Sequence, residues 1–171
     1  MMSSFPIFRF RAGSTGLAVL VGLFMASWTL SSTVDDAWIS ARYGASWAAG
    51  HGWVYSPDMP PVEGFTNLTW TALLGVSHAL SIPPLWAMCG LGLFCHAACI
   101  VAADGLGRAL APGTPQWTLV IPAWAVALSP HLAVTATNGL ETSLYLAVVL
   151  TCLWAAQGPR RPVLAAGLVC L

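Results

Sequence analysis

The chain has 171 residues, of which 57% are hydrophobic and 7% are charged, and its formal net charge is zero. A soluble globular domain carries about 25% charged residues, so too few polar side chains remain here to cover a soluble surface. The chain also has no lysine and no basic stretch, which excludes a nucleic-acid-binding face. The composition therefore predicts an all-α integral membrane protein, a polytopic helical bundle.

Several apolar runs are long enough to cross a membrane as helices. The first, 14–33, is about twenty uncharged residues, the length that a roughly 30 Å hydrocarbon layer requires. Arg9 and Arg11 before it also fit a signal peptide. The run exceeds a signal-peptide core of roughly 7–15 residues, however, and more spans follow, so we expect a retained anchor. The other expected spans are about 84–103, 117–135, 140–156 and an incomplete one from about 162.

The run 67–80 leaves the topology open, because it is short for a span and two prolines follow it. If it crosses the membrane, the later arginines fall outside. If it lies along the interface as an amphipathic helix, every arginine except Arg42 falls inside, as the positive-inside rule requires. We therefore expect a cytoplasmic N-terminus and one large external loop, 34–83, that contains short interfacial helices.

This topology collects most of the acidic residues on the external side of the membrane. The remaining acid, Asp104, is expected to pair with Arg108 one helical turn away. A small multi-span transporter would instead place ionisable groups inside its spans, where His96 is the single such group expected near a span centre. A transporter, a non-catalytic scaffold and an inactive remnant remain alternatives. The external acids are Asp35, Asp36, Asp58, Glu63 and Glu141.

Asp35 and Asp36 open a helical pattern that runs to Trp47 and stops at the glycines of 50–52. They can be explained structurally as helix caps that also favour the helix dipole. A cap needs only one of them, however, and capping does not exclude chemistry. Arg42 lies two turns from Asp35, so we expect both to address a ligand rather than each other.

The second half of the loop, "MPPVEGFTNLTW", indicates an extended Pro-rich arm, a turn, and the start of a helix that Thr66 or Asn67 caps. Glu63 in this turn is either a solvated carboxylate or a second member of an acidic site. In "TNGLETSLY", Asn138 is expected to cap a helix with Glu141 as its reciprocal acid. The functional alternative is that the Glu141 carboxylate faces the external loop.

Five tryptophans fall in or near the external region, and most of them are expected to be interfacial anchors. Some could stack on a sugar, and the sequence does not distinguish between these two roles. They are Trp28, Trp38, Trp47, Trp53 and Trp70.

The loop string "DDAWISARYGASWAAGHGWVYSPDMPPVEGFTNLTW" (35–70) resembles the first external loop of bacterial membrane glycosyltransferases of the GT-C fold. "NGLETSLY" (138–145) is similar to the second-loop motif of the same family. The likeness runs in order from residue 1 to about 160. It is nearest to mycobacterial terminal arabinofuranosyltransferases and related enzymes that use polyprenyl-phosphate sugars.

The resemblance implies a hexosyl- or pentosyltransferase of the bacterial inner membrane. Such an enzyme moves a sugar from a polyprenyl-phosphate donor to a glycan, lipid or protein acceptor of the cell envelope, on the periplasmic or outer face. Asp35 or Asp36 would be the general base for the acceptor hydroxyl. Arg42 would stabilise the leaving phosphate.

The resemblance also implies substrate-binding positions and a possible metal. A magnesium or calcium ion, if used, would find hard oxygen ligands in Asp35, Asp36 and Glu141, and no other cofactor is implied. Enzymes of this family have many more spans, so we expect 1–171 to be the amino-terminal part of a GT-C-like transmembrane domain, and whether this part is active or inactive alone stays open. The implied substrate-binding residues are Arg42, Tyr43, Glu63, Thr66, Asn67 and Glu141.

Overall fold

The computed structural model describes residues 5–30, 32–62, 64–115 and 117–157 of the chain. Within these ranges the regular structure consists of α-helices and contains no strand, which confirms the predicted all-α class. The helices are α1 (Phe5–Ser27), α2 (Asp35–Ala48), α3 (Leu68–Ala79), α4 (Pro84–Leu110), α5 (Ile121–Ala127), α6 (Pro130–Thr135) and α7 (Thr142–Ala156).

Among the described helices, α4 alone is both long and apolar enough to cross a membrane. Its 27 residues correspond to about 40 Å at 1.5 Å per residue, more than a hydrocarbon layer of roughly 30 Å. Two shorter apolar helical stretches are Gly13–Ser27 in α1 and the whole of α7. The described residues therefore contain one helix that could span a bilayer.

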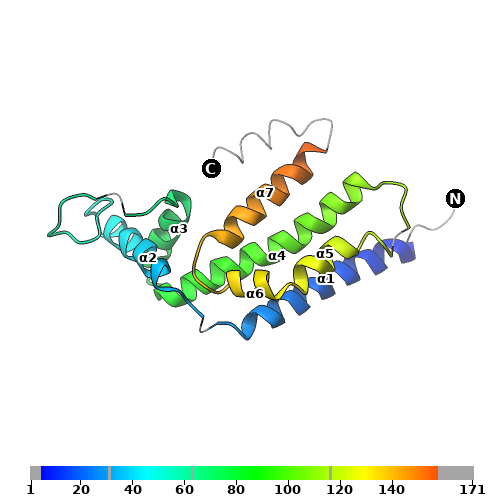
Figure 1. Ribbon diagram of the computed structural model, residues 1–171, viewed down its shortest axis with the longest axis horizontal. Coiled ribbons are helices and arrows are strands. Elements are labelled where there is room, and N and C mark those ends of the chain that lie inside the picture. Colours follow the sequence, from blue (N-terminus) through cyan, green and yellow to red (C-terminus); the bar gives the residue numbers. More distant parts are fainter. Residues whose placement is uncertain (1–4, 31, 63, 116, 158–171) are drawn as a thin grey trace.

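α4 is the central helix of the bundle. It lies between α7 on one side and α1 with α5 on the other (Figure 1). Small residues let the backbones approach closely. A Cβ atom on Gly92 would overlap the Ala136 carbonyl oxygen, and one on Gly105 would overlap the Trp154 ring. These glycines set how tightly α4 packs against the segment before α7 and against α7 itself.

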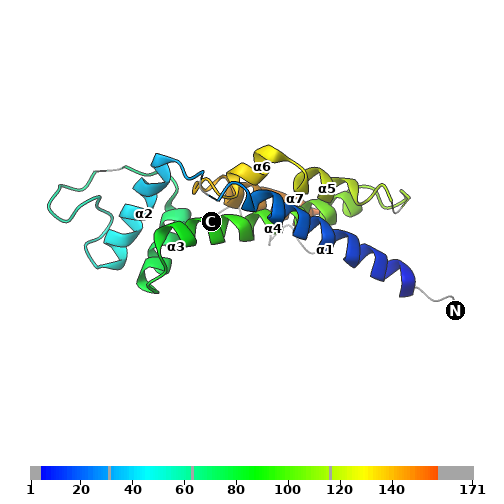
Figure 2. The same cartoon turned by 90° about the horizontal axis from the view of Figure 1, so that it is seen from below.

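α2 and α3 pack against each other in the same direction at one end of α4 (Figure 2). Their backbones touch, because a Cβ on Gly44 would lie 2.8 Å from the amide nitrogen of Gly75. Trp70 of α3 is fully buried in a core that joins this helix pair, through Ala37 of α2, to Met88 near the start of α4. The external loop predicted from the sequence is therefore a folded unit held against α4.

Helix bounds differ from the expected spans in three places. α1 ends at Ser27 rather than near 33, and α4 continues to Leu110 rather than 103. The range 117–135 holds two short helices, α5 and α6, because Pro130 lacks the N–H that a continuous helix needs and Ser129 caps a new one. The helices expected to begin at Asp35 and in the run 67–80 are present as α2 and α3. The span expected from about 162 lies outside the described residues.

Candidate active site

The two segments that carry the family resemblance, 35–70 (the first motif) and 138–145 (the second motif), meet at one end of the bundle. The backbone N–H of Val34, just before α2, donates to the Asn138 carbonyl at 3.0 Å. The Asn67 Nδ2 group, just before α3, donates to Glu141 Oε2 at 2.8 Å. Both bonds join the external loop to the segment before α7, so the N-terminal ends of α2, α3 and α7 come together.

Gly139 makes this junction possible. Its φ of +88° is a conformation that residues with a Cβ atom rarely adopt. A Cβ there would lie 2.6 Å from Ala37 Cβ and 3.1 Å from Met88 Sδ. Its carbonyl accepts a 3.0 Å hydrogen bond from Nε1 of buried Trp70. The "NG" of the second motif is therefore a tight turn seated between α2, α3 and α4.

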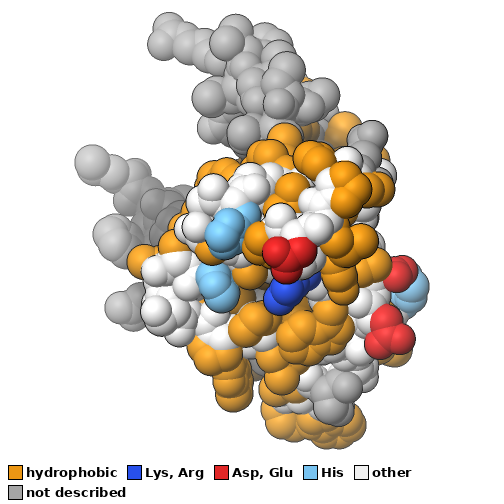
Figure 3. All heavy atoms as spheres, turned by 90° about the vertical axis from the view of Figure 1, so that its left-hand side faces the viewer, with side chains coloured by type: hydrophobic (Ala, Val, Ile, Leu, Met, Phe, Trp, Pro, Cys, Tyr) orange, Lys and Arg blue, Asp and Glu red, His pale blue; other side chains and the backbone are white. Residues whose placement is uncertain are grey.

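Asp35 and Asp36 are the first two residues of α2, and both are exposed. The prediction that one of them caps the helix is wrong. The N-cap is Val34, and it makes no side-chain capping bond. The two carboxylates still lie at the positive end of the helix dipole, where acidic side chains stabilise a helix. Figure 3 faces this end of the molecule and shows a few acidic groups on a mostly hydrophobic and uncharged surface.

Asn67 is the centre of the hydrogen-bond network. Its Oδ1 accepts from Ser40 Oγ of α2 at 3.1 Å and from Thr71 Oγ1 of α3 at 2.9 Å, while its Nδ2 group contacts Glu141. The predicted N-cap position is correct, but the amide makes no capping bond to the backbone of α3. Buried Ser40 was not predicted as a site residue, although it lies on the Asp36 face of α2.

The capping box predicted for Asn138 and Glu141 is wrong. α7 begins at Thr142, so Glu141 itself occupies the N-cap position, and Asn138 Oδ1 accepts from the Leu140 N–H in a local turn. The positive φ of Gly139 breaks the helical path that a capping box needs. The alternative, that the Glu141 carboxylate faces the external loop, is confirmed by its bond to Asn67.

Arg42 and Tyr43 lie away from this network and hold the rest of the loop. Exposed Arg42 donates from Nε to the Tyr55 carbonyl at 3.0 Å, and buried Tyr43 donates from Oη to the Val62 carbonyl at 2.8 Å. Arg42 lies seven residues after Asp35, about 10 Å along the helix axis. Both residues therefore fix the Pro-rich arm onto α2.

Thr66, another of the predicted site residues, borders a pocket. Thr66 is exposed and lines an open pocket of about 490 Å³. Glu63, the last member of the predicted acidic site, lies outside the described residues. The other lining residues of the pocket are Trp53, Pro61, Val62, Phe65 and Leu68.

The side chains expected to bind a metal are not clustered in the described part of the chain. In the part of the chain that the structure describes, no three or more His, Cys, Asp or Glu side chains are grouped to hold an ion. Asp35, Asp36 and Glu141, the expected ligands, do not form such a group. We therefore derive no catalytic step through a metal.

A second polar cluster lies toward the other end of α4. Arg108 and Asp104 form the predicted ion pair, and Asp104 Oδ2 also accepts from Thr15 Oγ1 of α1 at 2.9 Å. Arg108 contacts the same hydroxyl at 3.3 Å. A largely apolar stretch of α4 therefore separates two polar clusters that lie toward its opposite ends.

Comparisons of the chain with protein-family models, with curated proteins and with solved structures found no match.

Proposed function

We propose that the chain carries the catalytic loop of a polytopic membrane glycosyltransferase. The enzyme takes a sugar from a polyprenyl-phosphate donor and transfers it to a glycan, lipid or protein acceptor on the periplasmic face of a bacterial inner membrane. One observation carries the proposal. The bond from Asn67 to Glu141 brings the second motif of the resemblance onto the first, at the end of the bundle where the exposed pair Asp35 and Asp36 begins α2.

Asp36 is the better candidate for the general base. It lies on the same face of α2 as Ser40, whose hydroxyl donates to the Asn67 amide that holds Glu141. Asp35 shares a different face of the helix, about 100° around the axis, with Arg42. An acceptor hydroxyl near Asp36 would therefore be close to a polar network that can position it, whereas one near Asp35 would not.

In the proposed reaction, Asp36 takes the proton of the acceptor hydroxyl while the hydroxyl oxygen forms a bond to the anomeric carbon. The bond from that carbon to the phosphate oxygen breaks, and the lipid phosphate leaves with the electron pair. The N-terminal end of α2 favours a phosphate nearby, as the N–H groups and dipoles of helix N-termini do. Arg42 is exposed on the same helix, and its positive charge would also stabilise the leaving phosphate.

The multi-pass part of the proposal rests on composition and on the exposed faces of the helices. α1, α4 and α7 present large apolar side chains to their surroundings, such as Phe24, Phe94 and Leu153. Contiguous apolar surface of this kind is rare on soluble monomers and normal where lipid is the solvent. With the arginines inside, the acidic end of the bundle faces the periplasm.

The test is transfer of labelled sugar from a polyprenyl-phosphate donor by membrane vesicles that contain the chain. We expect Asp36→Asn to lower the transfer rate by about 10²–10⁴-fold, the usual contribution of a general base. Asp58→Asn removes the same charge from an exposed site of the same loop and should leave the rate unchanged. Equal rates for the parent and Asp36→Asn would refute the base assignment, and no transfer above empty vesicles would refute the function.

A further inference from the structure

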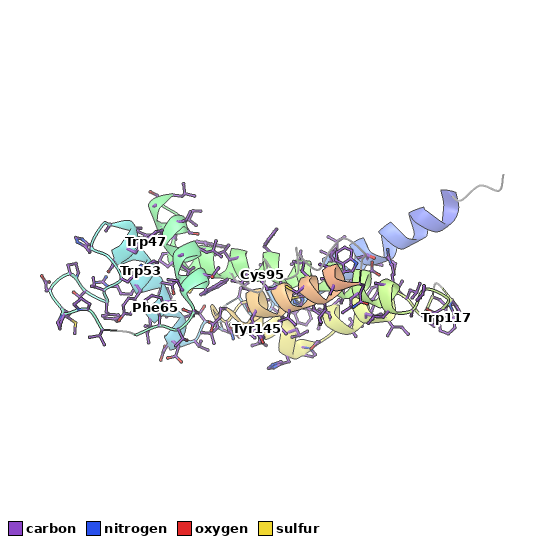
Figure 4. The ribbon with its side chains drawn as sticks, turned by 90° about the horizontal axis from the view of Figure 1, so that it is seen from above. Trp47, Trp53, Phe65, Cys95, Trp117 and Tyr145 are labelled. Atoms are coloured by element: carbon purple, nitrogen blue, oxygen red, sulfur yellow. The ribbon has the colours of Figure 1, made fainter. Side chains whose placement is uncertain are left out.

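Aromatic rings organise the arm of the external loop. Trp53 stacks on Trp47 of α2 with ring centroids 4.9 Å apart and an angle of 4° between planes. Phe65 lies 5.5 Å from Trp53 at 44°, and 4.8 Å from the ring of Tyr43. Figure 4 shows Trp47, Trp53 and Phe65 in a row at the loop end of the molecule. α2 thus supplies a platform on which the rings of the loop are fixed.

Two of these rings continue into the open pocket. Trp53 and Phe65 line it together with Thr66, whose exposed hydroxyl adds a polar group to an otherwise apolar wall. One face of Trp53 is covered by Trp47, so a ligand can meet only the rest of the ring, which Phe65 also borders. A volume of about 490 Å³ is in the range of small-molecule pockets, roughly 300–1,000 Å³.

The pocket adjoins the candidate active site. Thr66 and Leu68 both line it, and the residue between them is Asn67, whose amide bonds to Glu141. A molecule held in the pocket would therefore lie beside the network that includes Ser40 on the Asp36 face of α2. Trp47, on which Trp53 stacks, lies eleven residues after Asp36, roughly 16 Å along the helix axis, so an acceptor held in the pocket must extend along α2 for a hydroxyl group to reach the base.

The chemistry of the wall fits a sugar ring better than a lipid tail. A sugar ring has a face of C–H groups, which the electron-rich face of an aromatic ring attracts, and a rim of hydroxyls that need polar partners such as Thr66. The chain has a different surface suited to hydrocarbon. A groove between α1, α4 and α7, of about 360 Å³, is lined by side chains such as Val19, Phe94 and Trp154.

We propose that the pocket between Trp53, Phe65 and Thr66 binds one sugar ring of the acceptor, stacked on the indole of Trp53. This inference rests on the proposed function for the identity of the ring as part of an acceptor. The binding itself does not require transfer, so the two can be tested separately.

The experiment is saturation-transfer difference NMR on the whole chain in detergent. The probes are methyl α-glucopyranoside, methyl α-mannopyranoside and methyl α-arabinofuranoside, with mannitol as an open-chain polyol that has no ring face. We expect transfer to the ring C–H protons of at least one glycoside and none to mannitol. Trp53→Ala should weaken this binding by about tenfold, and Trp53→Phe by less.

Two further variants keep the result interpretable. Thr66→Val removes the hydroxyl without removing a ring and should also weaken binding. Trp117→Ala removes a tryptophan that is 70% exposed at the opposite end of the molecule and should change nothing (Figure 4). Together these two variants distinguish specific binding in the pocket from non-specific binding to exposed tryptophans.

Three outcomes would overturn the inference. The first is equal signals from glycosides and mannitol, and the second is unchanged binding in both Trp53→Ala and Thr66→Val. The third is quenching of Trp53 by brominated lipid without sugar binding, which would make the pocket a membrane anchor. If sugar binding depends on Trp53 but the vesicles show no transfer, the pocket stands and the proposed function fails.

Discussion

Asn67 and Glu141 are 74 residues apart in the chain, and the Nδ2 group of Asn67 donates to Glu141 Oε2 at 2.8 Å. The same Asn67 side chain accepts from Ser40 and Thr71, so one amide joins α2, α3 and the start of α7. This half-buried amide uses both its oxygen and its nitrogen. The positions of its three partners therefore depend on one another. The contact therefore ties the stability of the loop to the second motif.

Asn67→Asp should lower the free energy of unfolding by about 1–3 kcal/mol, because it replaces the donated bond with two facing carboxylates. Glu141→Gln added to it should restore much of the loss, since the new Gln amide can donate to the new carboxylate in the reverse direction. Thermal unfolding in detergent measures both. Asp58→Asn is the control for loss of an exposed charge. A double variant no more stable than Asn67→Asp would show that the pair is not coupled.

Gly139→Ala should destabilise the chain by about 1–3 kcal/mol, because its φ is +88° and the new methyl group would meet Ala37. Gly90→Ala is the matched control, since nothing lies within 4 Å of a Cβ there and alanine favours the helix. Denaturant titration of the purified chain separates the two. The turn assignment fails if Gly139→Ala unfolds at the same midpoint as the parent.

The helices of the loop could be predicted from the sequence because their signals are local. The pattern from Asp35 onward and the glycine with a φ of +83° at Gly50 mark the beginning and end of α2 without help from other segments. The role of Glu141 depended on contacts distant in the chain. A capping box and a tight turn share the letters "NGLE", and only the packing of Gly139 against Ala37 selects the turn.

The pocket could not be predicted from the sequence for a similar reason. A string with many tryptophans does not reveal which rings meet, and the stack of Trp53 on Trp47 depends on how the arm folds back onto α2. The break between α5 and α6 is easier to predict from the sequence. Ser129 followed by Pro130 is a helix-start signal inside an apolar run, and apolarity alone made the range look like one span.

Arg108→Ala should destabilise the chain more than Asp104→Ala, although both break the same ion pair. The side chain of Asp104 is only 7% exposed and would be left buried and charged, whereas Arg108 is 33% exposed and can extend to a polar surface. We expect a loss of about 1–3 kcal/mol for Arg108→Ala, discounted for its exposure. Thermal unfolding of the two variants side by side shows which is less stable. A lower stability of Asp104→Ala than of Arg108→Ala would contradict the prediction.

The proposed orientation of α4 across the membrane predicts which ends of the chain a reagent can reach. Asp58 lies in the predicted external loop, and Gly113 lies beyond the C-terminal end of α4. Both residues are exposed, so a cysteine at either position, Asp58→Cys or Gly113→Cys, can meet a reagent. In intact bacterial spheroplasts, a membrane-impermeant maleimide should label the first variant and leave the second unlabelled until the membrane is permeabilised. Cys89, Cys95 and Cys99 are buried within α4 and should contribute little background.

The parent chain measures that background in the same experiment, and a cytoplasmic marker protein that stays unlabelled shows that the spheroplasts are intact. Labelling of both variants before permeabilisation would mean that α4 does not cross the membrane. Labelling of Gly113→Cys alone would mean that it crosses in the opposite direction. The second result would remove the acidic end of the bundle from the periplasm, where the polyprenyl-phosphate donor of the proposed reaction must present its sugar, because an external acceptor cannot reach a base on the cytoplasmic side.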